Sequence, residues 1–345
     1  MIREKITESK SSTMAIHVSI LVPDAAVMEG IGDPLYMFST VNHFLTTAGA
    51  PAKFKVELVG LKKNVQLMNG LITVHPQRML NEVLHTDLIV IPPLCGDMAE
   101  ALEGNEGYKA WIIQQYEQGT EVVSLCTGAF LLASTGLLKG RKCSTHWLWA
   151  NDFRIMYPDV ELVDGKIITE DERIYSSGGA NCYWNLLLYL VEKHTSHEIA
   201  ILAANFFAID IDRDNQSCFM MFNGQKNHND DAVKKAQDYI EINYQDKITV
   251  ECLADKFAVG KRSFERRFKK ATNNTVLEYI QRLKMEAAKR SFESSRKNIS
   301  EVMYDVGYTD SKAFREVFKK VTGLTPIEYR NKYNKRLYAL SSQLQ

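Results

Sequence analysis

One pattern occurs twice in the last third of the chain: a short helix, a tight turn and a second helix rich in basic residues. The copies are "ITVECLADKFAVGKRSFERRFKKATN" and "NISEVMYDVGYTDSKAFREVFKK". In both, two phenylalanines stand four residues apart on the second helix, Phe264 with Phe268 and Phe314 with Phe318, which predicts one buried face and basic outer faces. Between them, "VLEYIQRLKMEAAKRSFES" predicts a helix that fixes their separation. The repeat predicts an all-α domain with two helix-turn-helix motifs.

The charge distribution suits such a domain. Residues 231–345 hold 24 Lys and Arg against 15 Asp and Glu, a net +9, whereas residues 1–230 carry a net −9. Lysine and arginine on the outer faces neutralise phosphates, arginine can contact guanine in two places, and glutamate can accept from cytosine. The sequence therefore predicts that this domain binds double-stranded DNA.

The preceding part alternates buried strands, such as "TDLIVIPP" and "EVVSLC", with amphipathic helices, such as "YKAWIIQQYEQG". This order predicts a parallel sheet covered by helices on both faces, an α/β three-layer sandwich. The polar stretch "NGQKNHND" is the predicted linker. The expected organisation is a disordered lead-in (1–13), the α/β domain (14–222), the linker (223–230), the helical domain (231–336) and a tail (337–345).

The stretch "VVSLCTGAFLLASTGLLKG" predicts a buried strand that stops at Cys126 and continues as a helix. Such a turn places the thiol beyond the carboxyl ends of the strands, where ligands bind in open α/β sheets. A helix N-terminus favours a thiolate, and its free N–H groups, starting at Thr127, can hold an oxyanion. His146 is a candidate base. Glu29 is a candidate acid, just before a helix that Pro34 is predicted to begin.

Two classes of function fit these residues. Glu29, Cys126, Thr127 and His146 can line a pocket that binds a small molecule, or Cys126, His146 and Glu29 can be catalytic in a Cys-dependent amidase or hydrolase. A dimerisation domain with a vestigial pocket and a redox-sensing thiol are further alternatives. The sequence predicts no cofactor and no metal site, since the "HTSH" pair has no third ligand and reads as a solvated helix face.

Residues 231–333 resemble the AraC/XylS type of transcription regulator through "LADKF…SFERRFKK", "EYIQRLKMEAAKRSF" and "VGYTDSKAFREVFKKVTGLTPIEYR". Members often carry arginine where this chain has Glu316. The resemblance implies that six side chains read or contact DNA. They are Arg262, Glu265, Arg266, Ser311, Lys312 and Arg315.

Residues 15–194 resemble the DJ-1/PfpI branch of the class I glutamine amidotransferase-like fold through "SLCTGAFLLASTGLLKGRKCSTHW", "GDPLYMF" and "YSSGG". Together the two parts resemble GlxA-type regulators, which implies a sensor for a small nitrogenous metabolite without established turnover, and a homodimer. The acidic residue of the family would stand at Gly30, one residue after Glu29, and Asp33 adds a carboxylate nearby. We therefore expect a DNA-binding regulator and not an enzyme.

The remaining expectations concern partners and location. RNA polymerase is a candidate partner of a regulator of this kind. The longest apolar runs are shorter than the ~20 residues that cross a bilayer. The start of the chain has no apolar signal core, and the six cysteines show no paired spacing. The expected location is the cytoplasm, with reduced thiols and no membrane partner.

Overall fold

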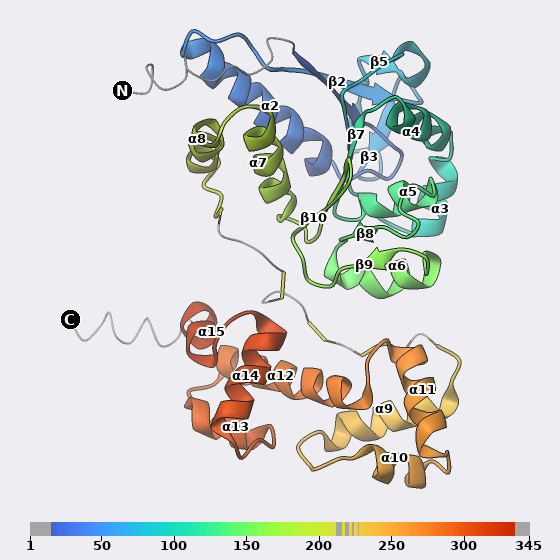
Figure 1. Cartoon of the computed structure of the whole chain (residues 1–345), viewed down its shortest axis with the longest axis vertical. Helices are drawn as coiled ribbons and strands as arrows, with labels where there is room; N and C mark the ends of the chain where they lie inside the picture. Colours follow the sequence, from blue (N-terminus) through green and yellow to red (C-terminus); the bar gives the residue numbers. More distant parts are fainter. Residues whose placement is uncertain (1–14, 212–215, 218–220, 223, 227, 335–345) are drawn as a thin grey trace, which may run out of the picture. The chain divides into compact units, whose positions relative to one another are not determined.

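The computed structural model describes residues 15–211, 216–217, 221–222, 224–226 and 228–334. The predicted lead-in and tail lie outside these residues. The chain divides into two compact units, Met1–Gln216 and Ser217–Gln345 (Figure 1). We call them the sensor unit, after the role predicted from the sequence, and the helical unit. The division falls six residues before the predicted end of the α/β domain.

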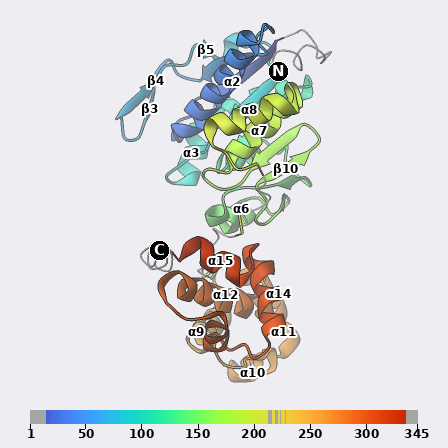
Figure 2. The same ribbon diagram turned by 90° about the vertical axis from the view of Figure 1, so that its left-hand side faces the viewer.

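A seven-stranded sheet forms the centre of the sensor unit, in the order β10-β11-β7-β6-β1-β2-β5. All neighbouring strands run parallel except β10, which is antiparallel to β11. The strands of this sheet are β1 (Ile16–Leu21), β2 (Phe54–Gly60), β5 (Arg78–Met79), β6 (Leu88–Ile91), β7 (Glu121–Leu125), β10 (Ile168–Asp171) and β11 (Ile174–Ser177). Two small sheets complete the unit: the hairpin of β3 (Val65–Leu67) and β4 (Ile72–Val74), which projects from the body in Figure 2, and the pair β8 (Lys142–Cys143) and β9 (Glu161–Leu162).

Helices cover both faces of the sheet, which confirms the predicted three-layer sandwich (Figure 1). Buried strand residues such as Ile20 and Val90 pack with one set of helices, and Ile89 and Val122 pack with the other. The first set is α2 (Glu29–Thr47), α7 (Tyr183–His194) and α8 (His197–Phe207). The second set is α3 (Met98–Gly104), α4 (Gly107–Glu117), α5 (Gly128–Ser134) and α6 (Ala150–Met156), with the short 3-10 turns Leu80–Glu82 and Trp147–Trp149 nearby in the chain.

The start of α2 differs from the prediction. The helix begins at Glu29, so Pro34 is its sixth residue and not its first. A proline at this depth leaves the carbonyl four residues earlier without its helical hydrogen bond. Tertiary packing overrides this cost, because the first turn lies against the end of β6: a Cβ on Gly30 would stand 2.1 Å from Cδ of Pro93.

The helical unit has seven helices among its described residues and two hydrophobic cores. The helices are α9 (Asp231–Asn243), α10 (Val250–Lys256), α11 (Lys261–Thr272), α12 (Val276–Ser294), α13 (Ile299–Asp305), α14 (Ser311–Thr322) and α15 (Pro326–Tyr333). The first half of α12 packs with α9, α10 and α11, and its second half packs with α13, α14 and α15. A single helix therefore belongs to both cores and fixes the two motifs relative to each other, as the sequence predicts.

Part of the predicted linker is hydrogen-bonded to the helical unit. The Phe222 ring packs edge-on against Tyr279, with centroids 5.0 Å apart. The buried amide of Gln237 on α9 donates to the carbonyl of Gln225 at 2.8 Å, and its oxygen lies 2.8 Å from Nε2 of His228. We call the described residues between Phe222 and Asp230 the strap. Its contacts make it part of the helical unit.

A partly buried ion network stands at the start of β7. The Glu121 carboxylate binds Nζ of Lys193 and lies 2.9 Å from Nε2 of His194, so His194 is not simply a solvated residue. Although burial alone would raise the pKa of Glu121, the hydrogen bonds and charges of His194 and Lys193 lower it to about 2. Because the folded pKa lies below the ordinary value, this carboxylate stabilises the fold at neutral pH, and that contribution is lost as pH falls from about 4.5 towards 2.

Replacing Glu121 with glutamine should therefore lower the free energy of unfolding of the sensor unit by about 2 kcal/mol at pH 7, because Lys193 keeps a half-buried charge without its carboxylate. The difference from the parent should shrink below pH 4. Denaturant titrations at several pH values measure it. Glu57→Gln, at a more exposed pair with Lys55 (3.6 Å), is the control and should change little. A constant difference at every pH would contradict the assignment.

Candidate functional site

The turn between β7 and α5 has the geometry predicted from the sequence. Cys126 follows the strand directly and has a φ of +53°, a left-handed conformation that is uncommon for a residue with a side chain. Its N–H donates to the carbonyl of Ser177 at the end of β11 (3.0 Å). A Cβ on Gly128 would stand 2.6 Å from the carbonyl oxygens of Ile91 and Pro92, so only glycine lets α5 begin this close to β6. The turn therefore holds Cys126 at the carboxyl edge of the sheet.

Thr127 holds this turn to the neighbouring loop. Its hydroxyl donates to the carbonyl of Leu94 (2.7 Å) and accepts from the N–H of Leu94 (3.0 Å). The side chain is buried. The hydroxyl of Thr127 therefore holds the loop after β6, and these two bonds leave one of its two acceptor positions unused.

The thiol of Cys126 is buried and protonated at neutral pH. Burial raises its pKa to about 12, and hydrogen bonds from Thr127 oppose this only in part. The predicted help from a helix N-terminus is small, since α5 has only seven residues and burial has the larger effect. A thiol with this pKa is a weak nucleophile.

His146 lies in the segment that packs on the turn. The hydroxyl of Thr145 donates to the carbonyl of Cys126 at 3.0 Å. The Nδ1 atom of His146 accepts the N–H of Leu148 at 3.1 Å, which places the ring proton on Nε2 in the neutral form. Burial lowers the pKa of His146 and favours this form. Nδ1 is occupied and Nε2 carries a proton, so the ring has no free acceptor for the thiol proton.

Carboxylates gather at the start of α2. Asp33 accepts a hydrogen bond from the hydroxyl of Tyr183 at 2.7 Å. Burial raises the pKa of Asp33, and the charge of Glu29 adds to this. Burial also raises the pKa of Tyr183, with further contributions from Asp33, Glu29 and Cys126, so these groups lie in one neighbourhood. Glu29 itself is exposed.

The structure explains why position 30 holds no acidic residue. Any side chain there would overlap the ring of Pro93. The charge of Asp33 was predicted from the sequence, but the contact with Tyr183 was not. The available signal was the aromatic pair after "SSGG", which follows the last strand of the sheet and so lies at its carboxyl edge.

The buried thiol predicts a labelling order. Iodoacetamide at pH 8 should modify the exposed Cys95 and Cys252 and leave Cys126 unmodified in the native protein, because thiolates and accessible thiols react first. Peptide mass spectrometry measures the extent of modification. Denaturation before labelling is the control and should make Cys126 reactive. Rapid modification of Cys126 in the native protein would contradict the protonated, buried state.

The six predicted DNA-contacting residues lie on the outer faces of α11 and α14, and all are exposed. The two helices have the same order of exposed, half-buried and buried positions from first residue to last. Phe264 and Phe268 are fully buried in one motif, and Phe314 and Phe318 in the other. Because each helix buries its phenylalanine pair, α11 and α14 expose equivalent positions to solvent.

Several basic side chains of α11 are held by partners. Lys261 binds Glu251, and Arg267 makes a two-pronged contact with Asp230 (2.7 and 2.6 Å). In contrast, the side chains of Arg262 and Arg266 make no hydrogen bond or ion pair within the described residues. Arg315 on α14 is likewise unpaired among them. These arginines are therefore available to an anionic partner.

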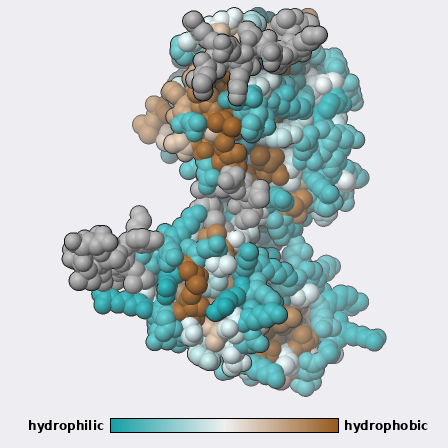
Figure 3. All heavy atoms as spheres, turned by 60° about the vertical axis from the view of Figure 1, so that its left-hand side comes forward, coloured by the Kyte–Doolittle hydropathy of each residue, from teal (hydrophilic) through white to brown (hydrophobic). Residues whose placement is uncertain are grey.

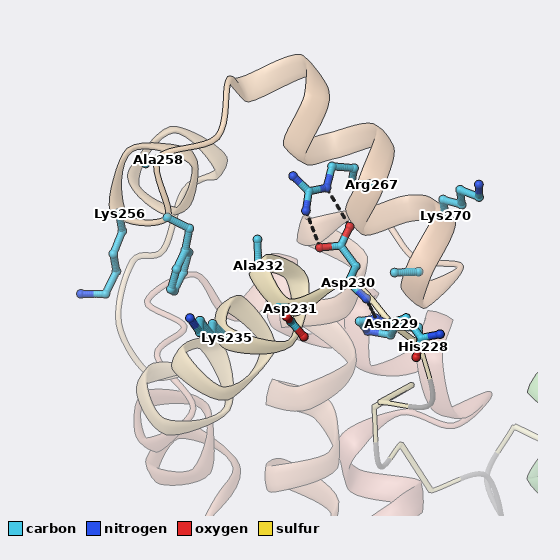
Figure 4. A pocket seen from close by; sticks show the side chains of 12 residues that line it. His228, Asn229, Asp230, Asp231, Ala232, Lys235, Lys256, Ala258, Arg267 and Lys270 are labelled. Carbon is cyan, nitrogen blue, oxygen red and sulfur yellow. Dashed lines mark hydrogen bonds and ion pairs between the residues drawn. The ribbon is translucent and has the colours of Figure 1, made fainter.

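A hollow of about 1100 Å³ lies beside α11 (Figure 4). Its lining includes the Asp230–Arg267 pair, with Lys235, Lys256 and Lys270 around it. The hollow is lined only by residues of the helical unit, and the predicted pocket residues Glu29, Cys126, Thr127 and His146 are not among them. It extends the basic surface of the first motif along one flank of the recognition helix. Within the described chain, no group of three or more potential metal ligands occurs, and no helix has the length and apolarity needed to cross a bilayer.

Comparison with known families agrees with this division. The DJ-1/PfpI family model matches residues 18–193, just over half of the chain. The chain belongs to the DJ-1/PfpI family. A helix-turn-helix domain model matches residues 253–332, which confirms both parts of the predicted resemblance.

Two curated relatives match a longer part of the chain than either family model does. The HTH-type transcriptional regulator ArgR of Pseudomonas aeruginosa is 24% identical over 219 residues, which cover 63% of this chain and 66% of the relative. The HTH-type transcriptional regulator GbdR of the same species is 22% identical over 238 residues, 69% of this chain and 65% of the relative. This member of the DJ-1/PfpI family thus spans just under two thirds of each of these relatives.

A solved structure shares the fold of the sensor unit. It is that of a proposed transcriptional regulator from Vibrio parahaemolyticus, with a TM-score of 0.51 and 23% identity. The match covers 56% of this chain and 99% of the other.

Proposed function

We propose that this chain is a sequence-specific transcription regulator that binds double-stranded DNA through α11 and α14 and is controlled by a small nitrogenous metabolite bound in the sensor unit. The observation that carries the proposal is the pair of recognition helices, which present equivalent exposed surfaces with unpaired arginines. The relatives named as transcriptional regulators support it. Such a protein works in the cytoplasm, and RNA polymerase is a candidate partner.

The base-reading side chains in this proposal are those the resemblance implies: Arg262, Glu265 and Arg266 on α11, and Ser311, Lys312 and Arg315 on α14. α12, nineteen residues long, spans about 28 Å at 1.5 Å per residue. This length suits two recognition helices in successive major grooves on one side of a duplex.

The effector site in this proposal surrounds Cys126, with His146, Glu29, Asp33 and Tyr183. We propose that it binds without turnover. The protonated thiol and the occupied Nδ1 of His146 support binding over catalysis. Two carboxylates beside a buried turn favour a cationic ligand, because a positive charge relieves their mutual repulsion.

We also propose a homodimer. An aromatic cluster lies on the face of the sensor unit that carries α2 and α8, where apolar side chains gather in Figure 3. Tyr36 and Phe206 are each more than half exposed. The ring of Phe206 contacts those of Tyr36, Phe44 and Phe207, and the rings of Tyr36 and Phe207 also contact each other. A second copy is the proposed occupant, since paired DNA-binding units gain affinity from joint attachment. Light scattering should give twice the mass of one chain.

The DNA proposal is tested by selecting duplexes from a random pool with the purified protein and titrating the selected sequence at several salt concentrations. Specific binding should exceed binding to a scrambled duplex by at least about 1000-fold and weaken steeply with salt. Equal, weak affinity for every duplex would overturn the proposal. Cys126→Ser separates the enzyme alternative: DNA binding should persist, and neither protein should release ammonia from amide substrates.

A further inference from the structure

The last residue of the sensor unit, Gln216, is inserted into its interior. The side chain is only 1% exposed. Its amide nitrogen donates to the carbonyls of Thr145 (3.1 Å) and Lys166 (3.0 Å), and its backbone N–H donates to Gly165 (2.6 Å). Three carbonyls from two loops therefore hold the point from which the chain leaves for the helical unit.

Two glycines make room for this amide. A Cβ on Gly178 would stand 1.8 Å from Nε2 of Gln216, and a Cβ on Gly179 would stand 3.2 Å from Oε1. The same Cβ on Gly179 would lie 2.7 Å from Sγ of Cys182. Both glycines follow β11 at the carboxyl edge of the sheet. We call the space beside Gly178 and Gly179 that holds the Gln216 amide the slot. It ends beside Cys182, and the side-chain oxygen of Gln216 lies at this end.

The side-chain oxygen of Gln216 is buried and has no hydrogen-bond partner among the described residues. The orientation of the amide is fixed, since its nitrogen lies between two carbonyls that can only accept. A buried acceptor without a partner costs free energy, and native proteins rarely leave one unsatisfied. The group is therefore suited to a donor that arrives from outside the chain.

The surroundings define the donor. Thr145 links the slot to the turn. Its backbone carbonyl accepts from the side-chain amide of Gln216, and its hydroxyl donates to the backbone carbonyl of Cys126. Cys182 contributes to the raised pKa of Cys126, and the next residue, Tyr183, binds Asp33. The neighbourhood thus offers a carbonyl oxygen on one side and carboxylates on the other. A compound that carries both a positive charge and N–H groups satisfies both.

We infer that Gln216 belongs to the effector site: its side-chain oxygen accepts an N–H of a small ammonium or guanidinium compound, and this contact couples occupancy of the pocket to the start of the connection to the helical unit. The inference rests on the proposed function. It identifies the residue through which binding acts on the connection, and it requires an effector with an N–H. A quaternary ammonium carries the charge but has no N–H, so it should not satisfy Gln216.

The first test uses the unchanged protein. Thermal unfolding is followed with ethanolamine, glycine, arginine or agmatine, and with choline and glycine betaine as the methylated counterparts of the first two. At about 10 mM, a compound with a Kd near 1 mM gives a measurable rise in the unfolding temperature. We expect at least one N–H compound to stabilise the protein and the methylated compounds to have no effect. Equal stabilisation by a methylated counterpart, or none by any compound, would overturn the inference.

The second test uses Gln216→Met, which preserves length and removes the amide. Calorimetric titration with the stabilising compound should show affinity reduced about 10-fold or more. Gln237→Met is the matched control, because Gln237 is an equally buried glutamine that holds the strap to α9. It should leave the affinity unchanged. If Gln216→Met is too unstable to titrate, the comparison of methylated and unmethylated compounds decides alone. Unchanged affinity in a folded Gln216→Met protein would refute the contact.

The coupling has its own readout. The effector should change the affinity of the parent protein for the selected duplex, and Gln216→Met should lose this response even at an effector concentration that fills its weakened site. A response equal to that of the parent would refute the coupling. The duplex titration without effector separates the two proposals: a protein that binds its duplex but none of the compounds retains the DNA assignment and loses this inference.

Discussion

Changing Arg262 and Arg266 together to alanine should lower the affinity for the selected duplex by about 100-fold or more. Both side chains lie on the exposed face of α11 and are unpaired within the described residues, so they can bind DNA without first breaking a bond within the protein. A two-pronged contact between arginine and guanine contributes about 1–3 kcal/mol. The affinity for a scrambled duplex should fall much less, because base contacts carry the specificity. Fluorescence polarisation measures both.

The salt dependence separates base contacts from phosphate contacts. If one of the two arginines also neutralises a phosphate, the slope of log affinity against log salt should fall by about 1. The matched control removes two positive charges from the sensor unit, Lys63→Ala with Lys139→Ala, and should leave affinity and slope unchanged. A double arginine variant that still discriminates between the selected and the scrambled duplex would contradict the assignment of α11 as a reading helix.

Changing Gly307 to alanine should destabilise the helical unit by about 3 kcal/mol or more. Gly307 has a φ of +74° in the turn of the second motif, a conformation that costs a residue with a side chain about 1–2 kcal/mol. The added Cβ would also stand 2.0 Å from the carbonyl oxygen of Gln245, in the loop after α9. Lys284 of α12 donates to the carbonyl of Gly307 at 3.2 Å, so this turn is in contact with the shared helix as well as with the loop after α9.

The first motif supplies the reverse change. Ala258 occupies the equivalent turn position with a φ of +52°, and its conformation favours glycine. Ala258→Gly should stabilise the unit by about 0.5–1 kcal/mol. Glycine removes the strain of the left-handed conformation, and the greater flexibility of glycine in the unfolded chain cancels part of this gain. Denaturant titrations of both variants measure the effects. Equal effects of the same sign would show that turn conformation does not control stability here.

Features with a local signal could be predicted from the sequence. The phenylalanine pairs four residues apart are the buried positions of α11 and α14, since helix periodicity and amphipathicity are properties of short stretches. Cys126 marks the turn from strand to helix for the same reason: an apolar strand run ends there and a glycine follows.

The features that could not be predicted depend on contacts between residues far apart in the sequence. The start of α2 depends on Gly30 meeting Pro93, more than sixty residues away. The bond between Tyr183 and Asp33 joins residues 150 positions apart, and that between Gln216 and Thr145 joins residues 71 apart. The protonation of His146 depends on a rotamer that no pattern encodes. Contacts of this kind appear only when the strands have brought their ends together.

The strap changes where the protein can be divided. Asp230 caps α9 and also binds Arg267 of the recognition helix, while Gln225 and Phe222 are held further back along the same surface. A fusion that joins a foreign sensor at residue 231 would discard these attachments and leave the guanidinium of Arg267 free to move. Exchange of whole modules between related regulators should therefore respect a junction at residues 216–217, and the strap should travel with the DNA-reading part.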